Sequence, residues 1–180
     1  MAAVLIWGDV NITGSLRGFA KANPAFESFC KTVTDYGNPL YYSVFGLFFL
    51  YGLVKKKKRL MKMLLVYMLI QLAASVIITG SLKIIVGRPR PGHGFEHDFF
   101  TKSSRFKSFP SGHTTDAFSS AGTIWMFIKN LPFAGAAIIF SLLIGLTRIF
   151  VGSHYLLDVT AGMLVGFLTA LLISKRFLDK

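Results

Sequence analysis

The sequence is short of cysteine and of acidic residues. Its 180 residues include one cysteine, Cys30, and eight Asp or Glu residues against twenty Lys or Arg residues. A single cysteine excludes an internal disulfide and a cysteine-based metal cluster, so Cys30 is by default a small apolar filler. The scarcity of acid leaves a formal net charge of +12, which is compatible with an anionic partner such as nucleic acid. The bases lie in short clusters between apolar runs, however, and this favours anchoring to the inner leaflet plus an anionic ligand.

The N-terminal segment lacks the features of a secretory signal peptide. The apolar stretch from Ala2 to Trp7 has no basic start, no long apolar core and no small-residue cleavage site, so we expect no cleaved leader. Charge is scarce overall: 16% of the residues are charged, 53% are hydrophobic, and the mean hydropathy is +0.56. This composition predicts one compact membrane domain over residues 1–180 rather than a soluble one.

Long apolar segments predict an all-α, polytopic transmembrane bundle of about five to six helices. The Lys55–Arg59 run is expected to be a cytoplasmic loop rather than a nucleic-acid or nuclear-localisation segment. Alternation then places the 87–111 loop and the 151–154 turn outside, and Lys129 and the C-terminus inside. The spans are expected within residues 39–174, at 39–54, 60–86, 112–128, 132–150 and 155–174.

Two amphipathic segments precede these spans. An Asn-Pro pair at 23–24 resembles an N-cap followed by proline at the first helical position, and apolar residues recur at helical spacing from Phe26 to Val33. The pattern predicts a helix that ends near Gly37, with a similar short piece over 15–22. We expect residues 1–38 to lie at the membrane surface, with ordinary packing on the bundle as the equal alternative.

Residues 108–116 form a loop that turns into a helix, with Pro110-Ser111-Gly112-His113 at its centre. Ser111 is placed to cap the first turn, and Gly112 lets the backbone approach a ligand. The free N–H groups of a helix start bind anions, and phosphate is the commonest biological candidate. His113 on that first turn is therefore placed to act on a bound phosphate.

His154 and Asp158 lie four residues apart and share one helix face. The carboxylate can accept a hydrogen bond from one ring nitrogen of His154 and leave the other free as a nucleophile or general base. The alternative is a histidine that is merely satisfied in the bundle interior. Arg148, at the end of the preceding span, weakens that alternative because a planar guanidinium grips phosphate oxygens through paired hydrogen bonds.

Under this topology, several ionisable residues from three distant segments fall near one membrane face. Single cations such as Arg88 can be explained by snorkelling. The convergence of two histidines, an aspartate and several cations at span ends is better explained by function. The residues are Lys83, Arg88, Arg90, His113, Arg148, His154 and Asp158.

These residues resemble a known signature. Lys83-x6-Arg90-Pro91, then Pro110-Ser111-Gly112-His113, then Arg148-x5-His154-x3-Asp158 is similar to the three-part motif of the type 2 phosphatidic acid phosphatase superfamily, which also includes the vanadium haloperoxidases. The resemblance covers residues 83–158, with all three parts present in order. Thr147 stands where the family usually has serine, and it keeps a hydroxyl.

The resemblance implies a role for each motif residue. His154 would attack phosphorus and form a phosphohistidine, Asp158 would fix its tautomer, and His113 would protonate the leaving oxygen and later activate water. The remaining motif positions would hold the phosphate without any metal or other cofactor. These are Lys83, Arg90, Ser111, Gly112 and Arg148.

The resemblance also implies an enzyme of a bacterial-type cytoplasmic membrane whose site faces the periplasm or outside. Its substrate would be a lipid phosphate monoester or diphosphate: phosphatidylglycerol phosphate, phosphatidic acid, undecaprenyl diphosphate or, as the favoured member, lipid A 1-phosphate. A non-catalytic lipid-phosphate binder or transporter is an alternative from another class, and a phosphatase for soluble substrates is a third. The expected partners are the lipid substrate and the bilayer, not nucleic acid, and the oligomeric state stays open.

The 92–107 loop and Asp116 complete the candidates. His93 and His97 could mimic a metal site with Glu96, but a third spaced ligand is missing, and a mobile outer loop is favoured. That loop either meets lipid tails and anionic headgroups or, as the equal alternative, is solvated with a few aromatics packed on the core. Asp116, one turn after His113, either orients that histidine or favours the helix N-terminus.

Overall fold

The protein is helical throughout the part that the structure describes. The computed structural model describes residues 2–94, 96–128 and 130–178, with side chains from Asp9 onward. No strand occurs in these ranges, and the all-α prediction is confirmed. The elements are α1 (Ala2–Ala22), α2 (Pro24–Val54), α3 (Lys58–Gln71), the π-helical η1 (Leu72–Thr79), α4 (Gly80–Val86), the 3-10 turn η2 (Ser104–Phe106), α5 (Gly112–Phe127), α6 (Leu131–Phe150) and α7 (Leu156–Leu178).

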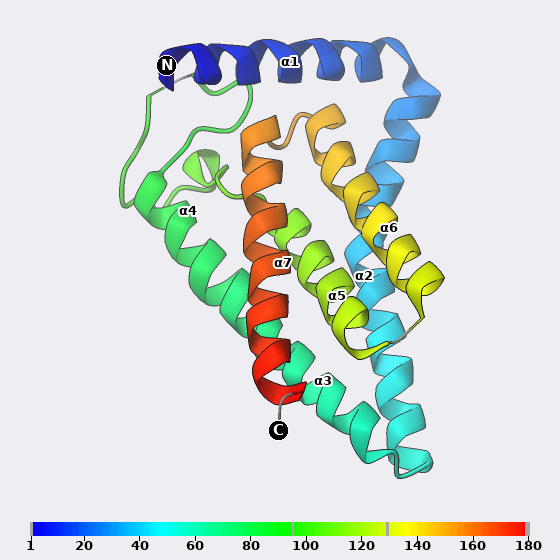
Figure 1. Ribbon diagram of the computed structural model, residues 1–180. Coiled ribbons are helices and arrows are strands. Elements are labelled where there is room, and N and C mark those ends of the chain that lie inside the picture. Colours follow the sequence, from blue (N-terminus) through cyan, green and yellow to red (C-terminus); the bar gives the residue numbers. More distant parts are fainter. Residues whose placement is uncertain (1, 95, 129, 179–180) are drawn as a thin grey trace.

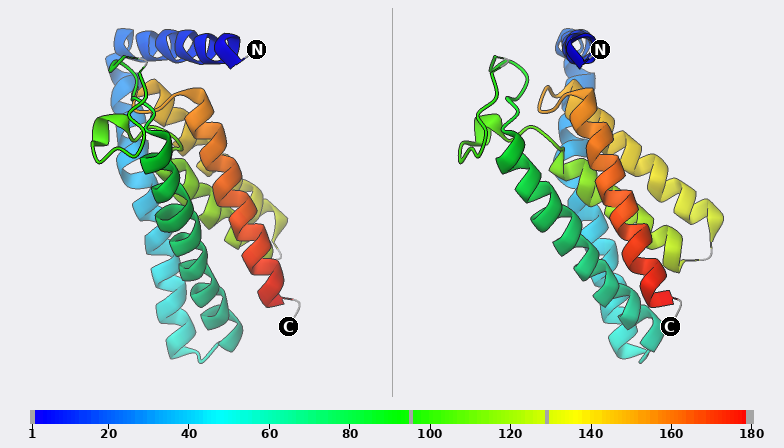
Figure 2. Two further views of the ribbon diagram at one scale, coloured as in Figure 1. Left: turned by 90° about the vertical axis from the view of Figure 1, so that its left-hand side faces the viewer. Right: turned by 60° about the vertical axis from the view of Figure 1, so that its left-hand side comes forward.

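Five long helical rods form a bundle, and α1 lies across one end of it (Figure 1). The rods are α2, the continuous run α3–η1–α4, α5, α6 and α7. The loop after α4 and the turn between α6 and α7 lie at the same end as α1, whereas the α2–α3 turn and the end of α7 lie at the opposite end (Figures 1 and 2). The segments expected to share one face therefore do share one end of the bundle.

Helix α2 corrects the expected boundary near Gly37. It begins after Asn23 with proline in its first turn, as predicted, but then continues to Val54 through Pro39. Gly37 serves close packing instead of ending the helix, because a Cβ there would lie 2.7 Å from the Ile144 side chain. Helix α1 is likewise longer than the 15–22 piece. The assignment of residues 1–38 to the membrane surface stays a prediction.

Among the residues that the structure describes, three helices are long and apolar enough to cross a membrane: Lys58–Val86, Leu131–Phe150 and Leu156–Leu178. Large apolar side chains are exposed around the bundle, among them Leu47, Met68 and Leu172. Lipid tails would cover such a surface, which would otherwise be a large apolar patch in water. The total of five to six spans stays a prediction, and Lys129, expected at an inner end, lies outside the described residues.

Helix α5 is the centre of the bundle, and its closest neighbour is α7. The two helices approach through glycines: a Cβ at Gly162 would lie 2.6 Å from the carbonyl oxygen of Ser111, and one at Gly166 would clash with that of Thr115. Small residues allow this backbone approach in membrane bundles. The contact positions His113, in the first turn of α5, beside the segment that leads into α7.

Candidate active site

The start of α5 is tied directly to the start of α7. The N–H of Ser111 donates to the carbonyl oxygen of Asp158 at 2.9 Å. Ser111 occupies the N-cap position, but its hydroxyl makes no capping bond and instead accepts from Thr114 Oγ1 at 2.9 Å. The expected side-chain cap is therefore wrong, because this hydroxyl is buried between helices. The backbone bond fixes the second motif against the third.

Lys83 reaches the N-terminus of α5 from α4. A Cβ built on Gly112 would lie 3.2 Å from the ammonium nitrogen of Lys83, so that ammonium stands directly over the glycine. The first N–H groups of a helix have no intrahelical partners. An ammonium beside them makes a compact site for an anion, and any side chain at position 112 would enter it.

Arg148 closes the site from the end of α6. It is 8% exposed, and its Nε has no hydrogen-bond partner within the described structure. Its carbonyl oxygen accepts from the N–H groups of Ser153 at 3.0 Å and His154 at 3.3 Å, which folds the α6–α7 turn back over the helix end. A buried guanidinium with an unused donor is suited to an anionic ligand.

His154 lies in that turn and is 1% exposed. Its Nδ1 is 3.6 Å from Oδ2 of Asp158, which is an ion-pair distance and too long for a hydrogen bond. Burial lowers the pKa of His154 to about 4, although the carboxylate of Asp158 acts in the opposite direction. The imidazole is therefore neutral at pH 7 and keeps the unprotonated nitrogen that a nucleophile requires.

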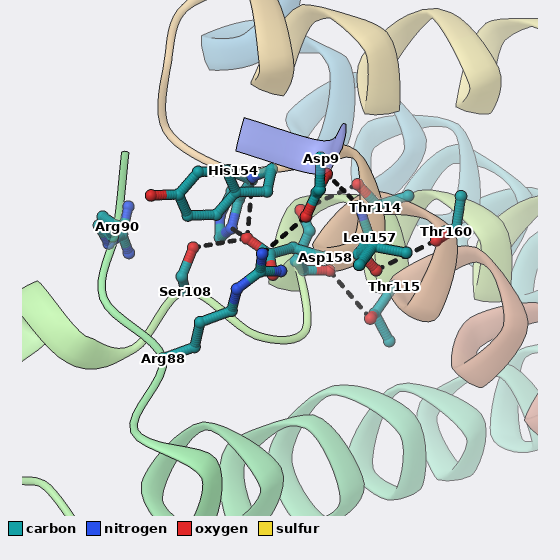
Figure 3. Close-up of polar contacts among 12 residues, drawn as sticks. Asp9, Arg88, Arg90, Ser108, Thr114, Thr115, His154, Leu157, Asp158 and Thr160 are labelled. Atoms are coloured by element: carbon teal, nitrogen blue, oxygen red, sulfur yellow. Dashed lines mark hydrogen bonds and ion pairs between the residues drawn. The ribbon is translucent and has the colours of Figure 1, made fainter. Parts of the chain in front are cut away.

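Asp158 is fully buried and is held by three donors. Its Oδ1 accepts from Arg88 Nη1 at 2.6 Å, and its Oδ2 accepts from Ser108 Oγ at 2.5 Å and the Tyr155 N–H at 2.9 Å. Figure 3 shows these contacts converging on the carboxylate beside His154. The hydrogen bonds stabilise the ionised form, so Asp158 presents a fixed negative charge to the imidazole.

Arg88, Ser108 and Asp9 are site residues that the motifs did not identify. Arg88 lies between the two carboxylates, donating to Asp9 Oδ2 at 2.6 Å as well as to Asp158. Burial acts to lower the pKa of Arg88, but the carboxylates of Asp158 and Asp9 together raise it above its ordinary value. One signal was available: Asp9 is the only acid among the first 26 residues, most of which are apolar or small.

His113 and Arg90 complete the cluster. The basic groups close enough to act on the charge of His113 include Arg148, His154, Lys83 and Arg90. Arg90 is held in the loop after α4, where its N–H donates to Arg105 O at 3.0 Å and its Nε to Ser104 O at 3.2 Å. In Figure 3, Arg90 stands apart from the Asp9–Arg88–Asp158 contacts. The eight candidate catalytic and phosphate-binding residues all come from segments at the α1 end of the bundle.

Three further candidates have structural partners. Asp116 accepts from Tyr42 and Ser75 and makes no hydrogen bond to His113 in the described structure, so it does not orient that histidine. The hydroxyl of Thr147 accepts from Thr34 at 2.9 Å. His97 Nδ1 contacts the Val86 carbonyl at 2.9 Å. Among the described residues, no group of three or more His, Cys, Asp or Glu side chains is arranged to hold a metal.

A family model and two curated relatives match this chain, and all three point to the same family. The family model described as the PAP2 superfamily matches residues 64–180. Undecaprenyl-diphosphatase BcrC of Bacillus subtilis (strain 168) is 28% identical over 171 residues, with 95% of this chain and 84% of the relative covered. Lipid A 1-phosphatase of Rhizobium johnstonii is 31% identical over 178 residues, with 89% and 71% covered.

Two solved structures share the fold. The crystal structure of Aquifex aeolicus LpxE superposes with a TM-score of 0.65 and 26% identity, covering 90% of this chain and 93% of that one. The PAP2-type phosphatidylglycerolphosphate phosphatase of Bacillus subtilis superposes with a TM-score of 0.68 and 24% identity, covering 98% and 87%. The second likeness is evidence for the fold alone.

Proposed function

The chain belongs to the PAP2 superfamily of membrane lipid phosphatases, and on that premise we propose that it hydrolyses a lipid phosphate through a phosphohistidine intermediate. One observation carries the proposal: a neutral, buried His154 lies beside the ionised Asp158, at the end of the bundle where His113 gathers with cations that form no ion pair in the described structure. A mere binder would need the cations but not a neutral imidazole backed by a carboxylate.

The phosphate would be held by cations from three elements. At the start of α5, the Lys83 ammonium and the Gly112 N–H would donate to the phosphate. Arg148 would donate from the end of α6, and Arg90 from the loop after α4. The hydroxyl of Ser111 is the remaining candidate donor. Fixed positive charge around the equatorial oxygens stabilises the transition state of phosphoryl transfer, which is the work that magnesium does in other phosphotransfer enzymes. The described residues therefore support a metal-independent mechanism.

The two histidines would divide the reaction. Since Nδ1 of His154 faces Asp158, its Nε2 attacks phosphorus, the N–P bond forms, and the bond to the lipid oxygen breaks. His113 gives its proton to that leaving oxygen. In the second step a water attacks phosphorus, His113 takes the water proton, and the N–P bond breaks to release phosphate.

Lipid A 1-phosphate is the first candidate substrate. Its support is the lipid A 1-phosphatase of Rhizobium johnstonii, which is 31% identical. Undecaprenyl diphosphate is the second candidate, supported by the BcrC relative, which covers 95% of this chain. Both present a terminal phosphate on a long lipid, so the same cationic centre serves either, and the surrounding groove would choose between them.

A substrate panel tests both the reaction and the choice of lipid. Purified protein in detergent is offered lipid A, undecaprenyl diphosphate, phosphatidylglycerol phosphate, phosphatidic acid and a short-chain soluble phosphate, and kcat/KM is measured for each from released phosphate. We expect the highest value with lipid A. A higher value with undecaprenyl diphosphate would reverse the substrate choice, equal rates on the soluble ester would argue against a lipid enzyme, and no release from any lipid would favour the binder.

We further propose that the protein lies in the bacterial cytoplasmic membrane with its site facing outward. The supporting pattern is the basic Lys55–Arg59 run at the end of the bundle opposite the site (Figure 1). Lys102 is exposed on the site-side loop, so a cysteine there in a Cys30→Ala background should react with an impermeant thiol reagent on intact cells. A cysteine at Lys57 is the matched control and should react only after lysis. The reverse pattern would overturn this orientation.

A further inference from the structure

Helix α1 contributes a buried carboxylate to the centre. Asp9 is 4% exposed, and both of its oxygens are used. Oδ2 accepts from Arg88 Nη2 at 2.6 Å, and Oδ1 accepts from the Leu157 N–H at 3.1 Å (Figure 3). An ionised carboxylate is buried at high cost unless it is paired and hydrogen-bonded in this way.

We propose that Asp9 is a positioning residue for the phosphatase centre: by holding Arg88 and the start of α7, it keeps Asp158 in place and negatively charged beside His154. The inference rests on the proposed function of His154 as nucleophile. It makes α1, which lies across the end of the bundle, part of the catalytic centre and not only a surface anchor (Figure 1).

The first contact fixes the arginine. Arg88 uses one terminal nitrogen for Asp9 and the other for Asp158, both at 2.6 Å, and its guanidinium carbon lies 4.3 Å from the centre of the Tyr155 ring. Two carboxylates and an aromatic face thus determine the position of a planar group. Without Asp9, one terminal nitrogen of Arg88 loses its partner, and the guanidinium is held only by Asp158 and the Tyr155 ring.

The second contact fixes the helix that carries Asp158. Leu157 is the second residue of α7, and its N–H is among those that have no intrahelical partner. Such donors are usually capped by a side chain just before the helix. Here the cap comes from Asp9, 148 residues earlier in the sequence, and it binds the residue next to Asp158.

The negative charge of Asp9 also affects the chemistry at His154, in addition to its structural contacts. Asp9, Arg88 and Asp158 together carry one net negative charge. Without the Asp9 charge, Arg88 would neutralise Asp158 alone, and the positive imidazole that forms as His154 attacks phosphorus would lose its counter-charge. A preorganised charge of this kind acts on the transition state more than on substrate binding, so the effect falls on kcat.

The test separates charge from capping. Asp9→Asn keeps an oxygen for the Leu157 N–H but removes the charge, and we expect kcat to fall about tenfold with KM changed less than twofold. Asp9→Ala removes both contacts and should lower kcat further, whereas Asp9→Glu should recover part of the loss.

In an Arg88→Gln background, Asp9→Asn should lower kcat less than twofold, because Asp9 acts through Arg88. The matched control is Glu27→Gln, which removes a partly exposed carboxylate paired with Lys31, far from Asp9 in the sequence, and should leave kcat unchanged.

A measurement that needs no turnover keeps this inference distinct from the proposed function. In protein labelled with ¹⁵N-histidine, the ring-nitrogen shifts of His154 should change in Asp9→Asn and stay the same in Glu27→Gln. Unchanged shifts, or a lower melting temperature with an unchanged kcat, would show that Asp9 only stabilises the fold. If the wild type hydrolyses no lipid, the proposed function fails, and the ring shifts still decide the role of Asp9.

Discussion

Replacement of His154 by alanine is expected to lower kcat for lipid phosphate hydrolysis by about 10⁴-fold or more, as the loss of a covalent nucleophile does elsewhere. The cations and the α5 N-terminus remain in the variant, so the phosphate is still bound and KM should change little. Burial keeps the pKa of His154 at about 4. The wild-type ring is thus ready to attack at pH 7.

Released phosphate is measured under single-turnover and multiple-turnover conditions. After an acid-free quench, radiolabelled substrate should leave label on the wild-type chain and none on His154→Ala. The matched control is His93→Ala, which removes a histidine from the exposed loop at the same end of the bundle and should keep wild-type rates. Hydrolysis that survives His154→Ala within tenfold would show that another group attacks phosphorus.

The sequence was sufficient to predict which end of the bundle the motif residues share, but not the contacts that hold them there. Lys83, the α5 start and the turn containing His154 were all recognisable because each motif is local, and helical alternation was sufficient to bring their ends together. Ser111 at the helix start is an example: its position was predictable from the sequence. The bond from its N–H to the carbonyl oxygen of Asp158 was not predictable, because that bond depends on how closely α7 packs on α5.

Contacts between distant segments explain the failures. Gly37 and Pro39 normally end a helix, but Gly37 is needed here for contact with Ile144, and α2 runs on to Val54. Asp9 lies 79 residues before Arg88 and 148 before Leu157, so no local pattern links them. The one sequence signal for Asp9 as a site residue was its place as a lone acid in an apolar segment, since a buried acid needs hydrogen-bond partners.

The second large effect is expected at His113, and it should depend on the leaving group. With a lipid phosphate monoester, whose alkoxide is a poor leaving group, His113→Ala should lower kcat about 10³-fold, because protonation of the departing oxygen and activation of water are both lost. With p-nitrophenyl phosphate, whose phenolate leaves without a proton, His154 should still be phosphorylated while its hydrolysis remains slow.

His113→Ala should therefore release a burst of about one nitrophenol per active site and accumulate phosphohistidine, which His154→Ala cannot do. Rapid-quench measurement of the burst and of label on the chain decides the point, with Thr147→Ser as a matched control that keeps the hydroxyl contact with Thr34. A full loss of phosphorylation with the activated ester would mean that His113 is required for attack itself. If His113→Ala still hydrolysed lipid phosphate at the wild-type rate, His113 would not be the general acid and base. The burst alone separates the acid/base half of the centre from the nucleophilic half, because both histidines lie among the same cations and their simple deletions look alike in steady-state rates.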